Sequence, residues 1–439
     1  SCVLLYVCVQ IYLCVCVCMC RYGFVFQKMF HQMFKNRGQR TWMQSRGNYL
    51  GGQSFGSSSY SDTYNYDKYV KALANAGFTG LVWAPEVRYA TCDADFDRRV
   101  QLMMLGTQAQ FNAWEHGDVP WTCKNTTSWD VFVRHYTLRA QLGPYLYTMA
   151  YEQSQTGLPI IRPLLLQYDQ DPRCRYLDDE YLIGDAFLMA PAGVGSTSGK
   201  ADTLEREIYF PGSNENLWYD YWSPSLHGNG SVVGGTRVLR HTPINKAPLF
   251  LRGGAVVTMG CVAGDLYPHN VSDGLTLLVA LSHEESGTAS GSLYLDDGVT
   301  RYDDDDVDVD GDDDGDDVDD GGVDDGVDGA VDGDGAFDAL ARFMVKFNVA
   351  DRELTSVVVD LAQTTTTSTT NTNVHTNTPT STTRKSGASL YAFPTVVNTV
   401  RVYGVTIGIT AVLLRSRNIT HVVPRTDYTW DDETNVLSV

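Results

Sequence analysis

The chain has 439 residues, of which 43% are hydrophobic and 11% aromatic, so it is long enough for about two or three folded domains. Its formal net charge is -20, but eighteen aspartates between positions 303 and 334 leave only about -2 for the rest. The sequence contains no basic stripe that could neutralise phosphates, which excludes a nucleic-acid partner.

The first twenty residues are uncharged and contain six of the ten cysteines, which alternate mostly with valine. Cysteines separated by one residue do not match zinc ligands, which are separated by two to four residues. The stretch resembles the translation of a repeated GT dinucleotide. We interpret residues 1–40 as a low-complexity or spurious segment without a metal site. The alternative is a signal anchor that ends at Arg21. Apart from this possible anchor, the sequence predicts no contact with a membrane.

Four N-x-Ser/Thr sequons, at Asn125, Asn229, Asn270 and Asn418, favour a secretory, lysosome-like or extracellular location. The sequence predicts no cofactor and leaves the oligomeric state open.

Residues 42–162 alternate short β-like runs with helical stretches, which is typical of βα repeats. A helix is predicted over 66–75, with Gly77 as its C′ residue, and a strand over 80–83. Further helices are predicted over 96–105 and, as one long helix, over 129–153. This pattern predicts an α/β domain over 41–165, which is the C-terminal part of a (β/α)8 barrel.

From Leu164 onwards the pattern changes to short apolar runs between Gly and Pro turns, which predicts antiparallel sandwich domains over 166–262 and 263–439. The expected strands include residues 181–183, 187–189, 208–210, 249–251, 255–257, 275–281, 291–295, 343–349, 356–361 and 397–408.

Two low-complexity insertions interrupt the last domain. The Asp-rich run at 303–335 and the Thr-rich run at 364–383 cannot bury enough apolar surface to become ordered, so we expect disordered, solvated loops. Asp306, Asp308, Asp310 and Asp317 imitate a calcium loop, but no helices flank them, and we do not predict a metal site.

Glycoside hydrolysis with retention needs a proton donor and a second carboxylate about 5 to 5.5 Å away. In a βα barrel the reacting groups follow the carboxyl ends of strands. Asp62, in Tyr60-Ser61-Asp62, and Glu86, in Trp83-Ala84-Pro85-Glu86, both occupy such positions. Either acid could equally be an ordinary surface residue, so position alone does not decide.

A set of motifs resembles glycoside hydrolase family 31, whose members include α-glucosidases, α-galactosidases and α-xylosidases. The resemblance covers residues 42–302 well and the remainder loosely. The matching segments are Ser45-Arg46 through Ser61-Asp62, Gly77-Phe78-Thr79-Gly80-Leu81, Arg98-Arg99-Val100-Gln101, Leu142-Gly143-Pro144-Tyr145-Leu146-Tyr147, Thr156-Gly157-Leu158-Pro159 through Leu164, Ile183-Gly184-Asp185, Met189-Ala190-Pro191, Trp218-Tyr219-Asp220-Tyr221-Trp222, Pro248-Leu249-Phe250-Leu251-Arg252-Gly253-Gly254 and Tyr294-Leu295-Asp296-Asp297-Gly298.

The resemblance implies a retaining α-glycosidase that hydrolyses O-glycosyl bonds of a carbohydrate substrate. Asp62 aligns with the acid/base and Arg46 with a substrate-binding arginine. Glu86 stands where the family has a substrate-binding Asp, and Trp83 begins the segment that replaces the family's Gly-rich loop. Trp114 replaces a sugar-binding histidine, which leaves galactose and xylose as alternatives to glucose.

The family's nucleophile lies in a Trp-x-Asp-Met-Asn-like segment, and no such segment precedes Arg46. We therefore expect an incomplete chain without its nucleophile. Two alternatives stay open, namely a catalytically inactive carbohydrate-binding or interaction fragment and a membrane-tethered acidic protein that collects cations on the Asp run.

Overall fold

The structure is a computed structural model that describes more than half of the chain. The described residues are 22–41, 43–45, 51–60, 66–79, 82–84, 86–88, 92–112, 118–123, 126–192, 203–223, 231–260, 275–283, 287–296, 298, 343–350, 353–360, 397–403, 412–416, 419–423, 429–431 and 436–438. The acidic run, the Thr-rich run and the asparagines of all four sequons lie outside these residues.

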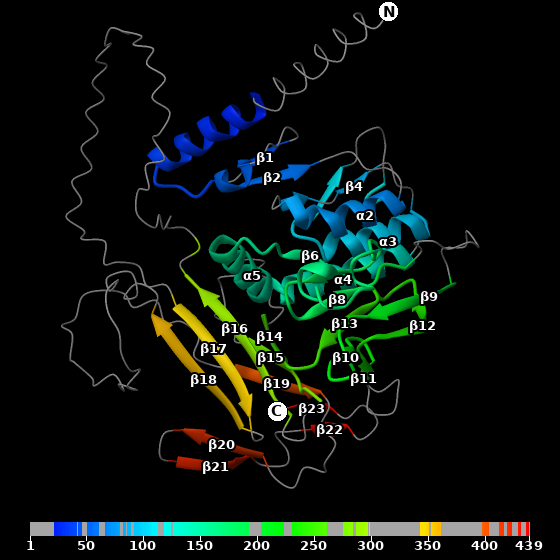
Figure 1. Ribbon diagram of the computed structural model, residues 1–439, viewed down its shortest axis with the longest axis vertical. Helices are drawn as coiled ribbons and strands as arrows, with labels where there is room; N and C mark the ends of the chain where they lie inside the picture. The colour runs from blue at the N-terminus through cyan, green and yellow to red at the C-terminus, as the bar shows by residue number, and fades with distance from the viewer. Residues whose placement is uncertain are drawn as a thin grey trace, which may run out of the picture.

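The first part of the chain combines short parallel strands with helices (Figure 1). Strands β1 (Met43–Ser45), β2 (Ser57–Tyr60) and β3 (Val82–Ala84) form a three-stranded parallel sheet, with the 3-10 helix η1 (Gly52–Phe55) before β2. Strands β4 (Glu86–Arg88) and β5 (Gln110–Asn112) form a separate parallel pair. Helix α2 (Tyr66–Ala76) and helix α3 (Ala94–Met104) confirm the helices predicted over 66–75 and 96–105.

Helix α2 ends as predicted, but Gly77 is not a left-handed C′ residue. It begins the 3-10 helix η2 (Gly77–Thr79) and has no positive φ. A Cβ at Gly77 would lie 2.7 Å from the carbonyl oxygen of Ile161 and 2.9 Å from carbons of Pro159 and Pro163. Glycine is required there because β6 (Ile161–Pro163) passes close to the backbone.

The single long helix predicted over 129–153 is wrong, because the chain forms two helices. These are α4 (Thr126–Gln141) and α5 (Gly143–Thr156), which meet at Leu142. Pro144 stands in the first turn of α5, where its missing N–H costs nothing, whereas inside a continuous helix the same proline would clash with the preceding turn.

A six-stranded sheet follows, with the order β11-β10-β13-β8-β7-β6, and all its pairs are antiparallel. The 3-10 helix η4 (Leu164–Leu166) follows β6, and β9 pairs with β12 in a separate antiparallel ribbon. The new strands are β7 (Tyr181–Ile183), β8 (Phe187–Met189), β9 (Thr203–Phe210), β10 (Leu217–Asp220), β11 (Ser231–Val233), β12 (Thr236–Pro243) and β13 (Leu249–Arg252).

The last large sheet has eight strands in the order β18-β17-β16-β14-β15-β19-β23-β22. Its members β14 and β16, and likewise β15 and β19, run parallel, so the prediction of purely antiparallel sheets is wrong here. β14 precedes the predicted boundary at 262 but pairs with strands that follow it. The strands are β14 (Ala255–Gly260), β15 (Leu275–Ala280), β16 (Ala289–Leu295), β17 (Phe343–Ala350), β18 (Glu353–Asp360), β19 (Val397–Tyr403), β22 (Thr429–Asp431) and β23 (Val436–Ser438), with β20 (Val412–Ser416) and β21 (Ile419–Val423) as a separate hairpin.

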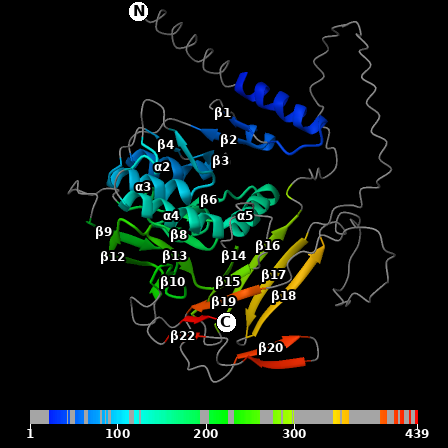
Figure 2. The same cartoon turned by 180° about the vertical axis from the view of Figure 1, so that it is seen from behind.

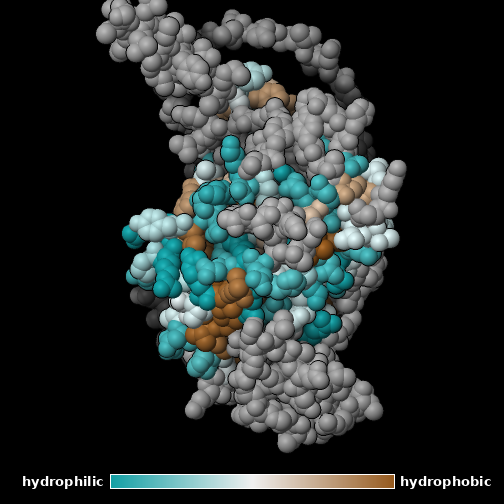
Figure 3. All heavy atoms as spheres, turned by 90° about the vertical axis from the view of Figure 1, so that its right-hand side faces the viewer, coloured by the Kyte–Doolittle hydropathy of each residue, from teal (hydrophilic) through white to brown (hydrophobic). Residues whose placement is uncertain are grey.

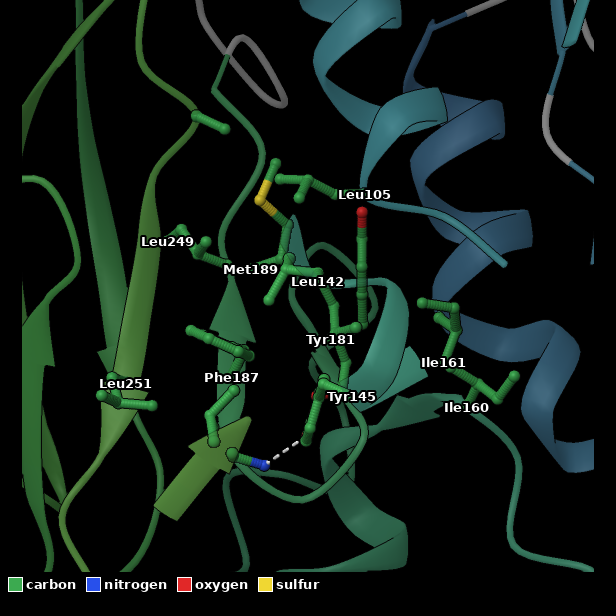
Figure 4. Packing of buried hydrophobic residues seen from close by; sticks show 14 of the residues in the cluster. Leu105, Leu142, Tyr145, Ile160, Ile161, Tyr181, Phe187, Met189, Leu249 and Leu251 are labelled. Atoms are coloured by element: carbon green, nitrogen blue, oxygen red, sulfur yellow. Dashed lines mark hydrogen bonds between the residues drawn. The ribbon is translucent and has the colours of Figure 1, made fainter. Parts of the chain in front are cut away.

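One hydrophobic core joins the helical part to both large sheets (Figure 4). It contains Leu105 after α3, Tyr145 of α5, Phe187 of β8 and Leu251 of β13, all at most 3% exposed. The Tyr145 hydroxyl donates to the carbonyl oxygen of Ile183 across 2.9 Å and accepts from the backbone N–H of Ala186 across 3.1 Å. A shared, closely packed core of this kind fixes the helices relative to the later sheets.

Residues 22–36, inside the segment 1–40 discussed above, form a helix that lies beside β1 and β2 in both ribbon views (Figures 1 and 2). No helix among the described residues is both long and apolar enough to cross a membrane. Most described residues on the face seen in Figure 3 are hydrophilic, with one larger hydrophobic patch in the lower half.

Candidate functional site

The carboxyl ends of β1, β2 and β3 lie at one edge of their sheet. The strands are parallel, with Ser45 opposite Ser59 and Ser59 opposite Trp83. The β1–β2 ladder ends at Ser45 and Ser59, and the β2–β3 ladder ends one residue further along β2, at Tyr60 and Ala84. Segments that leave these strands therefore begin side by side, which is the arrangement that places reacting groups at one face of a βα fold.

A second parallel pair extends this arrangement. Residue 85 alone separates β3 from β4, and Glu86 opens β4 opposite Gln110 of β5. Parallel pairing again directs the ends of both strands, at Arg88 and Asn112, to the same side.

Two of the five predicted site residues lie on described backbone, namely Trp83 within β3 and Glu86 at the start of β4. Arg46, Asp62 and Trp114 lie outside the described residues. In the sequence, Arg46 directly follows β1, and Asp62 and Trp114 come two residues after β2 and β5. All five predicted residues are therefore within or next to the parallel strands.

Polar side chains that sequence reasoning missed fix β1 and β2. Gln27, which is fully buried, donates from Nε2 to Oγ of Ser45 across 2.5 Å. Ser58 lies 4% exposed and donates to Oε1 of Gln108 across 3.1 Å. Buried hydrogen bonds of this kind hold the register of short strands. No sequence pattern indicates that Gln27 pairs with Ser45 or that Ser58 pairs with Gln108.

Helix α3 is anchored to the later β part through its buried face. Arg98 is 2% exposed and donates from Nη2 to the carbonyl oxygen of Thr242 across 2.6 Å. Gln101, one turn further, donates from Nε2 to the carbonyl oxygen of Ile244 across 2.6 Å. The Arg98-x-x-Gln101 pattern therefore serves as an anchor that fixes the helix between β4 and β5.

The N-terminus of α3 is closed by Asp93. Its Oδ1 accepts from the backbone N–H groups of Asp95 and Phe96 across 3.0 and 3.1 Å. This is an N-cap that satisfies otherwise unpaired donors of the first turn. The cap fixes where the helix begins after the segment that follows β4.

Arg139 of α4 closes the other end of α3 and the loop that leads into β5. Its guanidinium donates to the carbonyl oxygens of Met104, Gly106 and Thr107 across 3.0, 2.6 and 3.0 Å. Burial lowers the pKa of Arg139 to about 10, so the group stays charged at neutral pH. A cation at a helix C-terminus is favourable, and here it also positions the entry to β5.

The segments that follow β4 and β5 are joined by a disulfide between Cys92 and Cys123. The backbone N–H of Cys92 also donates to Oδ2 of Asp118 across 2.9 Å. Sequence spacing could not identify this pair, because the two cysteines are 31 residues apart without a recognisable pattern. The bond links the two connections that leave the candidate site edge.

No group of three or more His, Cys, Asp or Glu side chains among the described residues could hold a metal ion. The calcium-like Asp306, Asp308, Asp310 and Asp317 lie outside that part of the chain.

Solved structures define the class of this fold. The crystal structure of a glucosidase II alpha subunit is similar with a TM-score of 0.64 at 18% identity, and the match covers 95% of this chain and 40% of that one. A glycoside hydrolase family 31 dextranase from Flavobacterium johnsoniae, complexed with glucose, gives 0.58 at 17% identity and covers 95% and 47%. The chain thus has the fold of part of a family 31 glycoside hydrolase.

Sequence comparisons name the family independently. The profile of the glycosyl hydrolase family 31 C-terminal domain matches residues 157–257. Neutral alpha-glucosidase AB of Homo sapiens is 33% identical over 199 residues, which is 44% of this chain and 19% of the relative. Alpha-glucosidase of Schizosaccharomyces pombe is 26% identical over 277 residues, which is 60% of this chain and 27% of the relative.

These findings confirm the resemblance to glycoside hydrolase family 31, and the chain is homologous to the α-glucosidases of that family. It spans about a fifth to a quarter of the length of these two relatives.

Proposed function

We propose that this chain forms the C-terminal part of the (β/α)8 catalytic barrel of a family 31 retaining α-glycosidase, followed by two β-sandwich domains. The observation that supports this most directly is the shared parallel register of β1, β2 and β3. Arg46, Asp62 and Glu86 follow the ends of these three strands by one or two residues. Such positions hold catalytic residues in βα barrels.

Asp62 is proposed as the general acid/base. A carboxyl in this role protonates the leaving oxygen and then activates the water that releases the sugar. Arg46 is proposed to bind a sugar hydroxyl and to hold nearby carboxylates in their charged form.

Trp83, Glu86 and Trp114 are proposed to recognise the sugar. Glu86 would accept hydrogen bonds from hydroxyl groups, as a shorter Asp does in the family pattern. Trp114 would stack on a pyranose face in place of a histidine donor. Loss of one donor changes which hydroxyl pattern is preferred, so glucose, galactose and xylose are all tested as substrates.

Double displacement needs a nucleophile beside Asp62, and no Trp-x-Asp-Met-Asn-like segment precedes Arg46 in the sequence. The chain is therefore proposed to provide the acid/base and part of the sugar-binding surface. Hydrolysis requires a nucleophilic carboxylate supplied together with it.

A secretory, lysosome-like or extracellular location is proposed for this chain. The disulfide between Cys92 and Cys123 supports it, because such bonds persist in oxidising compartments. The four sequons are consistent with the same route.

The test compares sugar binding with hydrolysis in the purified chain. Titration calorimetry with methyl α-glucoside, methyl α-galactoside and methyl α-xyloside should detect one preferred sugar, and Arg46→Ala should weaken its binding about tenfold or more. Arg37→Ala, a change at an exposed arginine of the described part, is the matched control and should leave binding unchanged. Absence of binding to all three sugars would refute the proposal.

Hydrolysis of the corresponding nitrophenyl α-glycosides separates the two functional alternatives. Binding without hydrolysis identifies this chain as a carbohydrate-binding fragment. The same assay on a protein extended by the upstream reading frame should then show turnover if that frame encodes the nucleophile strand.

A further inference from the structure

Trp121 combines high exposure with a rigid setting. The residue is 65% exposed, whereas aromatic residues of the surrounding core, such as Phe96, are fully buried. An indole that is held rigidly at the surface offers a ligand a large contact face with an apolar body and a polar N–H.

Several contacts fix the turn that carries Trp121. Thr122 donates from its hydroxyl and from its backbone N–H to the carbonyl oxygen of Val119, both across 2.9 Å. The Thr122 hydroxyl also accepts from the backbone N–H of Val119 across 3.0 Å. Cys123 follows directly and is bonded to Cys92. The indole is therefore presented at little conformational cost to a ligand.

The ring of Trp121 packs against the ring of Phe111. Phe111 of β5 contacts it nearly perpendicularly, with ring centroids 5.9 Å apart at 74°. Phe111 in turn contacts Phe96 of α3, at 6.3 Å and 23°. The indole thus rests on partly buried Phe111, which packs against buried Phe96, and keeps most of its surface accessible.

Trp121 belongs to the connection from β5 to α4, which leaves β5 at its carboxyl end. This is the same connection that contains the proposed sugar-binding Trp114 in the sequence. A residue further along it, next to the start of α4, lies at the rim of the edge where the proposed site is formed.

We infer that Trp121 forms an outer sugar-binding subsite, where its indole stacks on the apolar face of a pyranose in an α-linked oligosaccharide. This inference rests on the proposed function, because it assigns to the same site a ligand longer than one sugar. The C–H bonds of a pyranose face are matched by the electron-rich face of an indole, and a rigid ring loses little entropy on stacking.

The experiment measures the ratio of two affinities by titration calorimetry. One ligand is the methyl α-glycoside that binds best, and the other is the α-linked trisaccharide of the same sugar. Trp121→Ala should weaken the trisaccharide about tenfold, which is 1.4 kcal/mol, and leave the monosaccharide unchanged. Trp121→Phe keeps an aromatic face and should recover most of the affinity.

Trp129 is the matched control, because it is also exposed, at 45%, but lies in the first turn of α4 and contacts Phe132 with centroids 5.6 Å apart. Trp129→Ala should leave both affinities unchanged.

Equal trisaccharide affinity in wild type and Trp121→Ala overturns the subsite, while intact monosaccharide binding keeps the proposed function. If wild type binds neither ligand, both fail. Equal losses of trisaccharide affinity in Trp121→Ala and Trp129→Ala would show that the effect is not specific to Trp121 and would overturn the subsite.

Discussion

Arg98 of α3 donates a 2.6 Å hydrogen bond to the carbonyl oxygen of Thr242, 144 residues later in the chain. A second bond, 3.3 Å long, reaches the carbonyl oxygen of Pro243. Through these bonds a charged donor of the parallel-strand part holds the carboxyl end of β12 and couples the candidate site to the β part. The later sheets therefore stabilise the helix between β4 and β5 as well as their own core.

Replacing Arg98 with methionine should lower the free energy of unfolding by about 2–4 kcal/mol, because two carbonyl groups lose a charged donor in a buried place. The urea midpoint should fall with little change of the m-value. Arg175→Met, at an exposed arginine, is the control and should stay within about 0.5 kcal/mol. Similar stabilities for both variants would contradict the anchoring role of Arg98.

Gly184→Ala should destabilise the protein far more than Gly157→Ala. Both glycines have a positive φ, at 60° and 75°. A Cβ at Gly184 would lie 2.1 Å from the Tyr145 hydroxyl oxygen, whereas nothing lies within 4 Å at Gly157. At Gly157, alanine should cost only the backbone strain of a left-handed residue, about 1–2 kcal/mol. At Gly184, alanine should cost the same strain and must also displace the Tyr145 side chain. Thermal unfolding midpoints measure the difference, and equal shifts would show that the clash is relieved without cost.

Removing the disulfide should destabilise the protein and loosen the turn of Trp121. The bond joins residues 31 apart, for which the loop-entropy relation gives about 3–4 kcal/mol. Cys92→Ser with Cys123→Ser should lower the thermal midpoint and speed hydrogen exchange of the Thr122 amide. Cys174→Ser, at a buried free cysteine, is the control for thiol removal and should leave the Thr122 amide protected. Unchanged exchange at Thr122 in the double variant would show that the hydrogen bonds to Val119 suffice.

Glu180 should make the protein less stable as the pH rises from about 4.5 to about 7. Burial raises the pKa of this carboxyl from 4.5 to about 7, against the opposing charge of Arg206. Between these values the unfolded chain has released a proton that the folded chain still holds, so raising the pH favours unfolding. The loss over this interval is on the order of 2–3 kcal/mol.

Glu180→Gln removes this titration but keeps an acceptor for the backbone N–H of Tyr209, which lies 3.0 Å from Glu180 Oε1. Urea unfolding at pH 5 and pH 7 should show a smaller difference for the variant than for wild type. Glu207→Gln, at an exposed glutamate of β9, should leave the wild-type difference intact. A wild-type pH dependence that survives Glu180→Gln would refute the assignment.

Asp62→Ala tests the acid/base assignment in a protein that also contains the nucleophile. Turnover of substrates with poor leaving groups should fall about 10²–10⁴-fold, because these need the proton. Activated nitrophenyl substrates should lose far less. Asp67→Ala, in the first turn of α2, is a nearby acidic control and should change neither rate appreciably. Small, equal losses on both substrate types would rule out Asp62 as the proton donor.

Local patterns predicted most elements of the fold. Apolar residues at helical spacing identified α2 and α3, and apolar runs between turns identified strands such as β7, β8 and β15. Failures occurred where local signals compete. Helical periodicity runs through Leu142, but Pro144 separates α4 from α5. Gly77 reads as a helix cap, although close approach of β6 is what requires a glycine there.

The sequence by itself carried the resemblance to glycoside hydrolase family 31, because the matching motifs are local and specific, and it placed the proposed site residues next to short strands. Only the tertiary structure decided which strands are neighbours, that β14 joins the later sheet, and that Cys92 pairs with Cys123. It alone connected Arg98 to the carboxyl end of β12 and Gln101 to the residue that follows this strand. These relationships join residues far apart in the chain, and their energy depends on burial and direction, which no local pattern encodes.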